Sequence, residues 1–127
     1  LGNINSERDF TFVSDTANAL LKATSEKKAI GEIINVGSGT ETRIQDLAHR
    51  IAKIVGIKIK IKTDESRLRP YDVNRLVCNN MKARKLLKWT PKVSLDEGLK
   101  FTFEWAKKNK VAFNAPFMRW YYKNTAE

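Results

Sequence analysis

Three side chains in this sequence have the chemistry of an anion-binding site. Arg8 stands before an acidic and an aromatic residue at the edge of an apolar segment, and Arg69 precedes Pro70 in a polar stretch that also contains Asp72. A guanidinium group pairs with phosphate oxygens through parallel hydrogen bonds, and a nearby carboxylate can accept from ribose hydroxyls. Arginines in loops more often form surface ion pairs, so the residues alone leave both interpretations open.

A glycine-rich stretch, Gly37-Ser38-Gly39, has to be compared with phosphate-binding loops. The dinucleotide fingerprint G-x-G-x-x-G requires a third glycine at the position of Thr42, and the Gly-Lys-Ser/Thr of a Walker A loop is also missing. We therefore interpret this stretch as a tight turn that leads from a strand into a helix.

The sequence offers little for a metal site or a nucleophile. His49 is the only histidine and Cys78 the only cysteine, which is far below the usual ligand clusters. A Ser-His-Asp or Cys-His site is not expected for the same reason. We interpret Cys78 as a small core residue and His49 as a surface or boundary residue of a helix.

Length and composition indicate one soluble globular domain. The 127 residues include 42% hydrophobic and 30% charged residues, and no apolar run approaches a membrane span or the core of a signal peptide. A single cysteine is compatible with a reducing compartment, so we expect the cytoplasm. Because the chain begins with Leu1 rather than Met, we expect it to be part of a longer protein.

The net charge of +10 favours an anionic partner such as phosphate groups, nucleic acid or an acidic surface. A basic nucleic-acid-binding module is therefore the competing hypothesis, with the aromatic tail stacking on bases. Against it, lysines such as Lys82, Lys85 and Lys88 are dispersed on helix faces, and no RNA- or DNA-binding signature occurs.

The first half of the chain alternates strands and helices. Residues 8–13 predict an extended segment, and Asp15 predicts the N-cap of a helix that ends near Lys27-Lys28. A brief β-like run follows at 32–36. Thr42 and Gln45 have the spacing of a capping box, and they open a helix that Gly56 ends.

The second half begins with a strand at 57–62, where isoleucines alternate with lysines. Residues 64–74 predict a loop, 81–87 a short helix capped by Asn79 or Asn80, and 88–91 a break. Ser94 and Glu97 form a second capping box that opens the last helix. An aromatic-rich tail occupies 111–127. We expect it to dock on the core of this chain or on the rest of a longer protein, and packing on a neighbouring chain is the alternative. This order is typical of an α/β or α+β unit.

Several stretches together resemble a known family. They are Leu1-Gly2-Asn3-Ile4 followed by Arg8-Asp9-Phe10-Thr11-Phe12-Val13, Glu32 to Gly39, Arg69-Pro70-x-Asp72-Val73 followed by Asn79 to Pro91, and Ser94 to Leu99. In this order they resemble the C-terminal part of extended short-chain dehydrogenases/reductases. The similarity is strongest to nucleotide-sugar 4,6-dehydratases of the GDP-mannose and legionaminic-acid-pathway type, and the 4-epimerases are nearly as close.

The resemblance implies an α/β fragment that contains the last strands and helices of such an enzyme and a small substrate-binding cap, without a complete Rossmann domain. Residues 1–108 would be the substrate-binding domain, and 109–127 the aromatic-rich tail. Arg8 and Arg69 would bind the diphosphate of a nucleotide sugar, Asp72 its ribose and Asn3 its nucleotide. The dehydratases usually carry the longer Glu at the position of Asp72.

The resemblance also implies what this chain lacks. The family binds NAD near its N-terminus and carries a catalytic Tyr-x-x-x-Lys in its middle, but the residues four after Tyr71, Tyr121 and Tyr122 are not lysines. We therefore expect no catalytic, cofactor-binding or metal-binding residue here, and a chain that is inactive alone. Its expected partners are a nucleotide sugar and the N-terminal Rossmann part of an enzyme that is a homo-oligomer.

Overall fold

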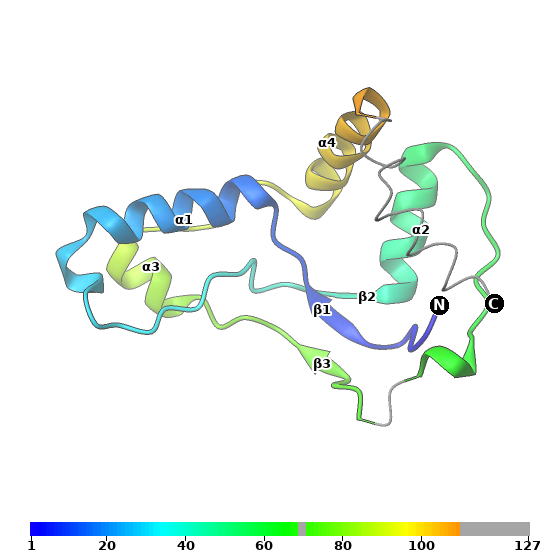
Figure 1. The fold of residues 1–127 in the computed structure, drawn as a ribbon, viewed down its shortest axis with the longest axis horizontal. Helices are drawn as coiled ribbons and strands as arrows, with labels where there is room; N and C mark the ends of the chain where they lie inside the picture. The colour runs from blue at the N-terminus through cyan, green and yellow to red at the C-terminus, as the bar shows by residue number, and fades with distance from the viewer. Residues whose placement is uncertain (69–70, 110–127) are drawn as a thin grey trace.

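A computed structural model describes residues 1–68 and 71–109, which form a mixed α/β unit (Figure 1). The expected α/β fold class is confirmed. The elements in chain order are β1 (Glu7–Asp9), α1 (Val13–Ser25), η1 (Lys27–Ala29), β2 (Glu41–Arg43), α2 (Ile44–Val55), η2 (Glu65–Arg67), β3 (Arg75–Leu76), α3 (Met81–Leu87) and α4 (Leu95–Lys108).

A small sheet stands between two helix pairs. Helices α1 and α3 pack together at one end of the elongated molecule, and α2 and α4 pack together on the other side of the sheet (Figure 1). The strand order is β2-β1-β3, with β1 antiparallel to β2 and parallel to β3. Arg8 in the central strand lies opposite Thr42 on one side and Leu76 on the other.

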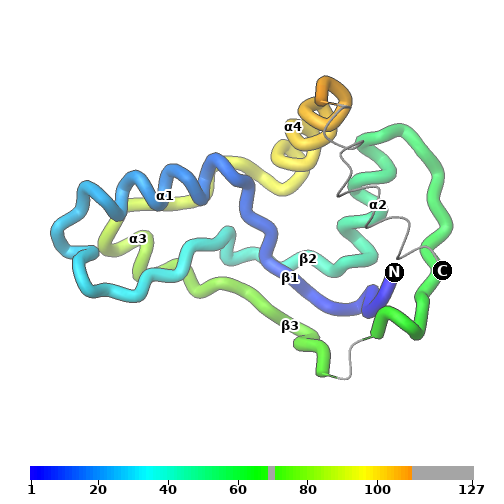
Figure 2. The backbone as a smooth tube through the Cα atoms, viewed as in Figure 1, coloured from blue at the N-terminus to red at the C-terminus, as the bar shows by residue number. Residues whose placement is uncertain are grey.

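Two strands predicted from the sequence are absent among the described residues. Residues 32–36 are extended and run beside the chain that leads from β3 to α3 (Figure 2), but no neighbouring strand pairs with them. Residues 57–62 also form no strand, and Ile57 and Ile59 remain 56% and 38% exposed. A segment with a strand-like sequence forms a strand only where a neighbouring strand can pair with its backbone. The short strands β2 and β3 were not predicted.

Helix α1 begins earlier than predicted. Its N-cap is Phe12, so the prediction that Asp15 caps this helix is wrong, and the extended segment is correspondingly shorter. Asp15 is 4% exposed, and its Oδ2 accepts hydrogen bonds from the backbone N–H groups of Lys92 and Val93 at 3.0 and 2.9 Å. Its carboxylate therefore ties α1 to the segment before α4.

The two predicted capping boxes have opposite outcomes. Thr42 belongs to β2, and the N-cap of α2 is Arg43, whose side chain makes no capping hydrogen bond, so the first box is wrong. At α4 the box is confirmed: Ser94 Oγ accepts from Glu97 N–H, and Glu97 accepts from Ser94 N–H. Gly56 ends α2 in a left-handed conformation, φ 79°, as predicted.

The core lies between α1 and α3. Trp89 is 1% exposed, and its Nε1–H donates to the backbone oxygen of Asp15 at 3.0 Å. Small alanines let the two helices approach closely, and the buried cluster consists of Ala19, Ala83, Leu87 and Trp89. No helix in the described part of the chain is long and apolar enough to cross a membrane.

Candidate functional site

A hollow of about 400 Å³ opens between β1, β3 and the turn that follows residues 32–36. These three segments are far apart in the sequence and meet because β1 is the central strand. The hollow therefore depends on tertiary contacts of β1. Its lining consists of Arg8, Asp9, Thr11, Asn35, Val36, Gly37, Leu76, Val77, Cys78 and Asn79.

Arg8 is the cation of this hollow. Its Nη1 donates to the backbone oxygen of Glu7 at 2.8 Å, and its Nη2 pairs with Oδ1 of Asp72 at 3.0 Å. The side chains of Arg8 and Asp72 are only 25% and 23% exposed. A partly shielded pair with a second hydrogen bond is more restrained than an exposed one, so the guanidinium is held in a defined position.

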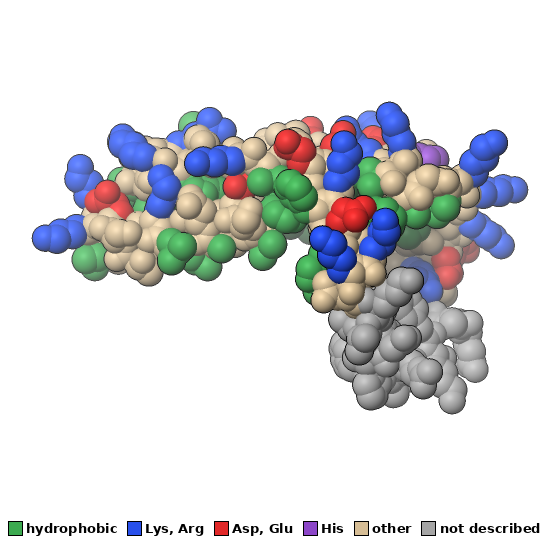
Figure 3. Space-filling view, turned by 90° about the horizontal axis from the view of Figure 1, so that it is seen from above, with side chains coloured by type: hydrophobic (Ala, Val, Ile, Leu, Met, Phe, Trp, Pro, Cys, Tyr) green, Lys and Arg blue, Asp and Glu red, His purple; other side chains and the backbone are tan. Residues whose placement is uncertain are grey.

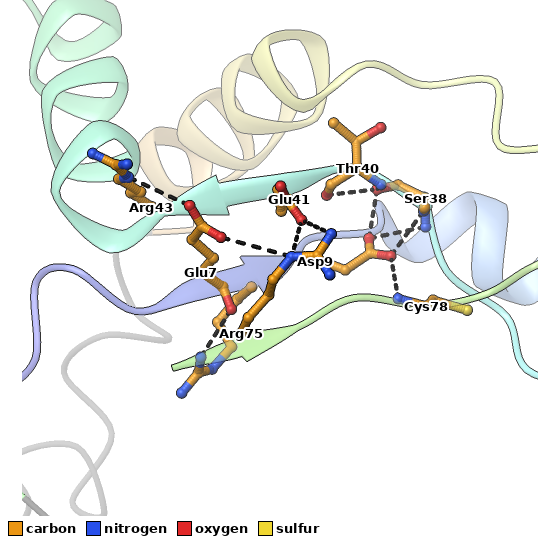
Figure 4. Close-up of polar contacts among 10 residues, drawn as sticks. Glu7, Asp9, Ser38, Thr40, Glu41, Arg43, Arg75 and Cys78 are labelled. Carbon is orange, nitrogen blue, oxygen red and sulfur yellow. Dashed lines mark hydrogen bonds and ion pairs between the residues drawn. The ribbon is translucent and has the colours of Figure 1, made fainter. Parts of the chain in front are cut away.

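Asp9 joins three segments of the chain through one carboxylate (Figure 4). Oδ1 accepts from Ser38 N–H at 2.9 Å, from Ser38 Oγ at 2.5 Å and from Thr11 Oγ1 at 3.5 Å. Oδ2 accepts from the N–H groups of Gly39 at 2.8 Å and Cys78 at 3.2 Å. Burial acts to raise the pKa of Asp9, but the hydrogen bonds from Ser38, Gly39 and Cys78 outweigh it and lower the pKa below its ordinary value.

The Gly-Ser-Gly stretch is a tight turn as predicted, but it leads from an unpaired extended segment into β2 rather than from a strand into a helix. The amides of Ser38 and Gly39 are already used. Gly39 has a φ of +76°, which suits glycine, and Gly37 lies directly against Cys78. Consecutive N–H groups of Ser38 and Gly39 could bind a phosphate, but here they bind the carboxylate of Asp9. The turn is therefore an internal anchor.

Charged side chains form a ladder on the sheet beside this anchor (Figure 4). Glu7 lies 3.4 Å from Arg43 and 3.8 Å from Arg75, and Arg75 also pairs with Glu41 at 2.5 Å. The ladder crosses all three strands. Opposite charges on neighbouring strands stabilise the pairing and help to fix the register of strands that are only two or three residues long.

The other residues predicted for the site are placed differently. Asn3 lies in the turn before β1, where its Oδ1 accepts from Asn5 N–H at 3.1 Å, and it does not line the hollow. Arg69 and the tail 111–127 lie outside the described residues. The structure therefore brings together two of the four predicted residues, Arg8 and Asp72.

His49 has the surface position that the sequence predicts, whereas Cys78 is not the core residue that was expected: it is only partly buried and lines the hollow. The Cys78 side chain is partly buried against Gly37, and burial and the charge of Asp9 raise the pKa of its thiol, which disfavours a thiolate nucleophile. His49 is exposed on α2. Within residues 1–68 and 71–109, no group of three or more His, Cys, Asp or Glu side chains could hold a metal ion.

A larger hollow of about 750 Å³ between α2 and α4 has different chemistry. Its rim carries the exposed ion pair Arg50–Asp96 at 2.8 Å, together with Lys53, Lys100 and Glu104. The charges of this rim are mixed and solvated. Arg50 offers a useful reference for Arg8, since both arginines pair with an aspartate.

Comparison with known sequences shows that the chain is similar to part of several sugar-nucleotide enzymes. A sequence model of the GDP-mannose 4,6-dehydratase family matches residues 1–102. A putative GDP-L-fucose synthase 2 of Arabidopsis thaliana is 36% identical over 104 residues, which cover 82% of this chain and 30% of that protein. A putative UDP-glucose 4-epimerase of Methanocaldococcus jannaschii is 35% identical over 108 residues, 85% of this chain and 33% of that protein.

Solved structures of epimerases are also similar to this chain. An epimerase of Methanothermobacter thermautotrophicus superposes with a TM-score of 0.83 at 34% identity, over 91% of this chain and 34% of that one. The UDP-glucose 4-epimerase of Thermotoga maritima, solved with UDP-glucose, superposes with a TM-score of 0.77 at 32% identity, over 85% and 34% of the two chains. The chain spans about a third of the length of the curated relatives it matches.

Proposed function

Because the chain belongs to the extended short-chain dehydrogenase/reductase family of NAD-dependent nucleotide-sugar epimerases and dehydratases, we propose that it supplies the nucleotide-sugar-binding part of a 4,6-dehydratase. The observation that carries this proposal is the position of Arg8, which lines a hollow and is held by its ion pair with Asp72. The family match over residues 1–102 supports the dehydratase assignment.

Arg8 has donors to spare for a diphosphate. A guanidinium group carries five N–H donors, and the described residues accept from its Nη1 and Nη2 only. Phosphate oxygens can occupy the remaining donors without breaking the pair with Asp72. Arg69 would add a second guanidinium from the same loop that carries Asp72.

Asp72 would contribute twice. Its Oδ1 holds Arg8, so its second oxygen is the one that would accept from a ribose hydroxyl. The short aspartate thus reaches both groups only if the ribose lies close to Arg8. Asn3, whose side chain caps a turn in this structure, would contact the nucleotide by giving up its bond to Asn5.

The described residues do not fit the pyrophosphate of NAD. The only glycine-rich turn between residues 1 and 68 uses the consecutive N–H groups of Ser38 and Gly39 to bind Asp9, so this pair is not free for a second anion. When bound elsewhere in the enzyme, NAD would accept the hydride of the sugar. The contribution of this chain would be to bind the substrate and hold it in place.

The N-terminal Rossmann part would cover an exposed apolar face of this chain. Residues 33–36 form no backbone hydrogen bond with another described residue, and Ile30 and Ile33 are 82% and 86% exposed. Leu20 and Leu21 on α1 are also more than half exposed. Hydrophobic side chains are visible at the surface over the α1 half of the molecule (Figure 3). A strand from the missing part could pair with 33–36 and bury these side chains.

The corresponding part of a 4-epimerase is the alternative, and the UDP-glucose 4-epimerases among its relatives favour it. The two reactions share the oxidation of the sugar and differ in the fate of the oxidised sugar. The product formed by the complete enzyme would decide between them, because only a dehydratase converts a nucleotide hexose to a 4-keto-6-deoxy product.

The binding proposal can be tested by mapping on a ¹⁵N-labelled chain. We expect titration with GDP-mannose or UDP-glucose to shift the amide signals of Arg8, Asn35, Leu76 and neighbouring residues around the hollow. Shifts confined to the α2–α4 hollow would contradict the proposal. Tighter, salt-dependent binding of a random oligonucleotide would favour the nucleic-acid hypothesis instead.

We also expect the chain to be inactive alone, since it contains no Tyr-x-x-x-Lys. Incubation with nucleotide sugar and NAD should give no product, and measurable turnover would overturn this part of the proposal. Size-exclusion chromatography with and without residues 111–127 would test whether the aromatic tail mediates self-association. A homo-oligomer that depends on the tail should elute later once the tail is removed.

A further inference from the structure

We propose that Asp9 is a positioning residue for the anion site at Arg8, an inference that rests on the proposed function. Asp9 does not have to touch the ligand. Its carboxylate binds the N–H groups of Ser38, Gly39 and Cys78 to the end of β1. Gly37, which precedes Ser38, and Cys78 line the hollow together with Arg8 and Asp9 itself.

The anchor is needed because β1 is short. The strand spans three residues and pairs with three residues of β2 and two of β3, so few backbone contacts oppose its sliding or fraying. Asp9 adds five acceptor contacts at the last residue of the strand. Bonds to a charged acceptor are stronger than neutral ones, and here they converge one residue from Arg8.

The contacts require a carboxylate. An asparagine offers one acceptor oxygen and one NH₂ donor. With its NH₂ on the Oδ2 side, the N–H groups of Gly39 and Cys78 would face a donor. In the opposite orientation, the N–H of Ser38 would do so. At least one backbone donor therefore loses its partner in Asp9→Asn, which loosens the wall of the hollow beside Arg8.

Asp15 provides a matched control. It is also an aspartate whose carboxylate accepts from two backbone N–H groups, those of Lys92 and Val93, but it does not line the hollow. Asp15→Asn should therefore lower stability without moving Arg8. A second variant, Ser38→Ala, keeps the carboxylate and removes one of its side-chain donors.

The experiment measures two quantities on the full chain. One is the Kd for GDP-mannose and UDP-glucose, and the other is the NMR signal of the Arg8 side-chain Nε–H. Each protein is measured at a temperature that lies a fixed number of degrees below its own Tm. We expect Asp9→Asn to weaken binding by about tenfold and to broaden or shift the Arg8 signal. Asp15→Asn should leave both at their wild-type values.

The outcomes separate this inference from the proposed function. A wild-type chain that binds neither nucleotide sugar would refute the proposed function, and the Arg8 signal would still decide the role of Asp9. Wild-type affinity and an unchanged Arg8 signal in Asp9→Asn would overturn the inference, as would equal effects of Asp15→Asn. If Asp9→Asn fails to fold, an unchanged Arg8 signal in Ser38→Ala would overturn it.

Discussion

Arg8 and Asp9 are neighbours in the sequence, but their side chains act on different parts of the structure. Arg8 lines the hollow and its guanidinium pairs with Asp72, whereas the carboxylate of Asp9 accepts from the amides of Ser38, Gly39 and Cys78. One side chain would meet the ligand and the other would hold the backbone that presents it.

The lowered pKa of Asp9 predicts how acid affects stability. A carboxylate whose folded-state pKa is depressed stabilises the fold above its unfolded pKa of about 3.9, and this contribution is lost as the pH falls through the folded-state pKa. We expect the stability difference between wild type and Asp9→Asn to be constant above about pH 5 and to shrink below about pH 4.

Urea unfolding of both proteins across this range would measure the difference. The carboxylates of Asp64 and Glu97 also have lowered pKa values. Both proteins contain them, so their contributions cancel in the stability difference between wild type and Asp9→Asn. A difference that does not change with pH would show that the charge of Asp9 contributes nothing.

Gly37 predicts a steric effect at the same place. A Cβ added there would lie 2.3 Å from Cys78 Cβ and 2.9 Å from Asp9 Oδ2, so Gly37→Ala should cost about 2 kcal/mol of unfolding free energy. Gly31 is the reference, since its Cβ would meet nothing within 4 Å and only its φ of +76° opposes alanine. Gly31→Ala should cost about 1 kcal/mol. Chemical denaturation would measure both losses, and a larger loss for Gly31→Ala than for Gly37→Ala would contradict the prediction.

At the scale of elements, the two helix starts make a direct comparison. Ser94 and Glu97 exchange hydrogen bonds at the start of α4, but Thr42 makes no such bond at the start of α2. Ser94→Ala should lower the unfolding free energy by about 1 kcal/mol through the lost cap. Thr42→Ala should cost less, because no cap is lost, and equal losses in urea unfolding would contradict this difference.

Elements whose signals are local could be predicted from the sequence, and those that depend on distant partners could not. The α4 capping box and the Gly56 end of α2 are set by residues within one helical turn, and both predictions are confirmed. The β-like run at 32–36 and the alternating run at 57–62 both predicted strands, but among the described residues neither of them pairs with a strand. Asp15 resembled a local cap while its real partners, Lys92 and Val93, are 77 and 78 residues away.

The candidate site shows the same limit. Arg8 and Asp72 were named through the family resemblance, and their contact spans 64 residues. Asp9 was missed because the amides that it binds lie 29 to 69 residues further along the chain. The available signal was the Gly-Ser-Gly turn itself, since consecutive turn amides that bind no phosphate can bind a carboxylate of the same chain.

At the scale of the whole molecule, the exposed apolar face predicts separate effects on stability and association. Ile33 is 86% exposed, so Ile33→Lys should change the unfolding free energy of this chain by less than about 0.5 kcal/mol. It should weaken association with the N-terminal part of the enzyme, because a lysine would be buried there. Co-purification of the two parts would measure this effect. As a control, Lys85→Ala, at an exposed position on α3, should leave association unchanged.

Arg8 and Arg50 allow the most direct test of the central claim that this chain binds a nucleotide sugar at Arg8. Both arginines pair with an aspartate, at 3.0 and 2.8 Å, but only Arg8 lines the hollow beside β1. The measurement is calorimetric titration of wild type, Arg8→Ala and Arg50→Ala with GDP-mannose and UDP-glucose. The account predicts that wild type and Arg50→Ala bind at least one sugar equally well and that Arg8→Ala binds it at least about tenfold more weakly. Equal binding by all three proteins, or none by the wild type, would contradict it.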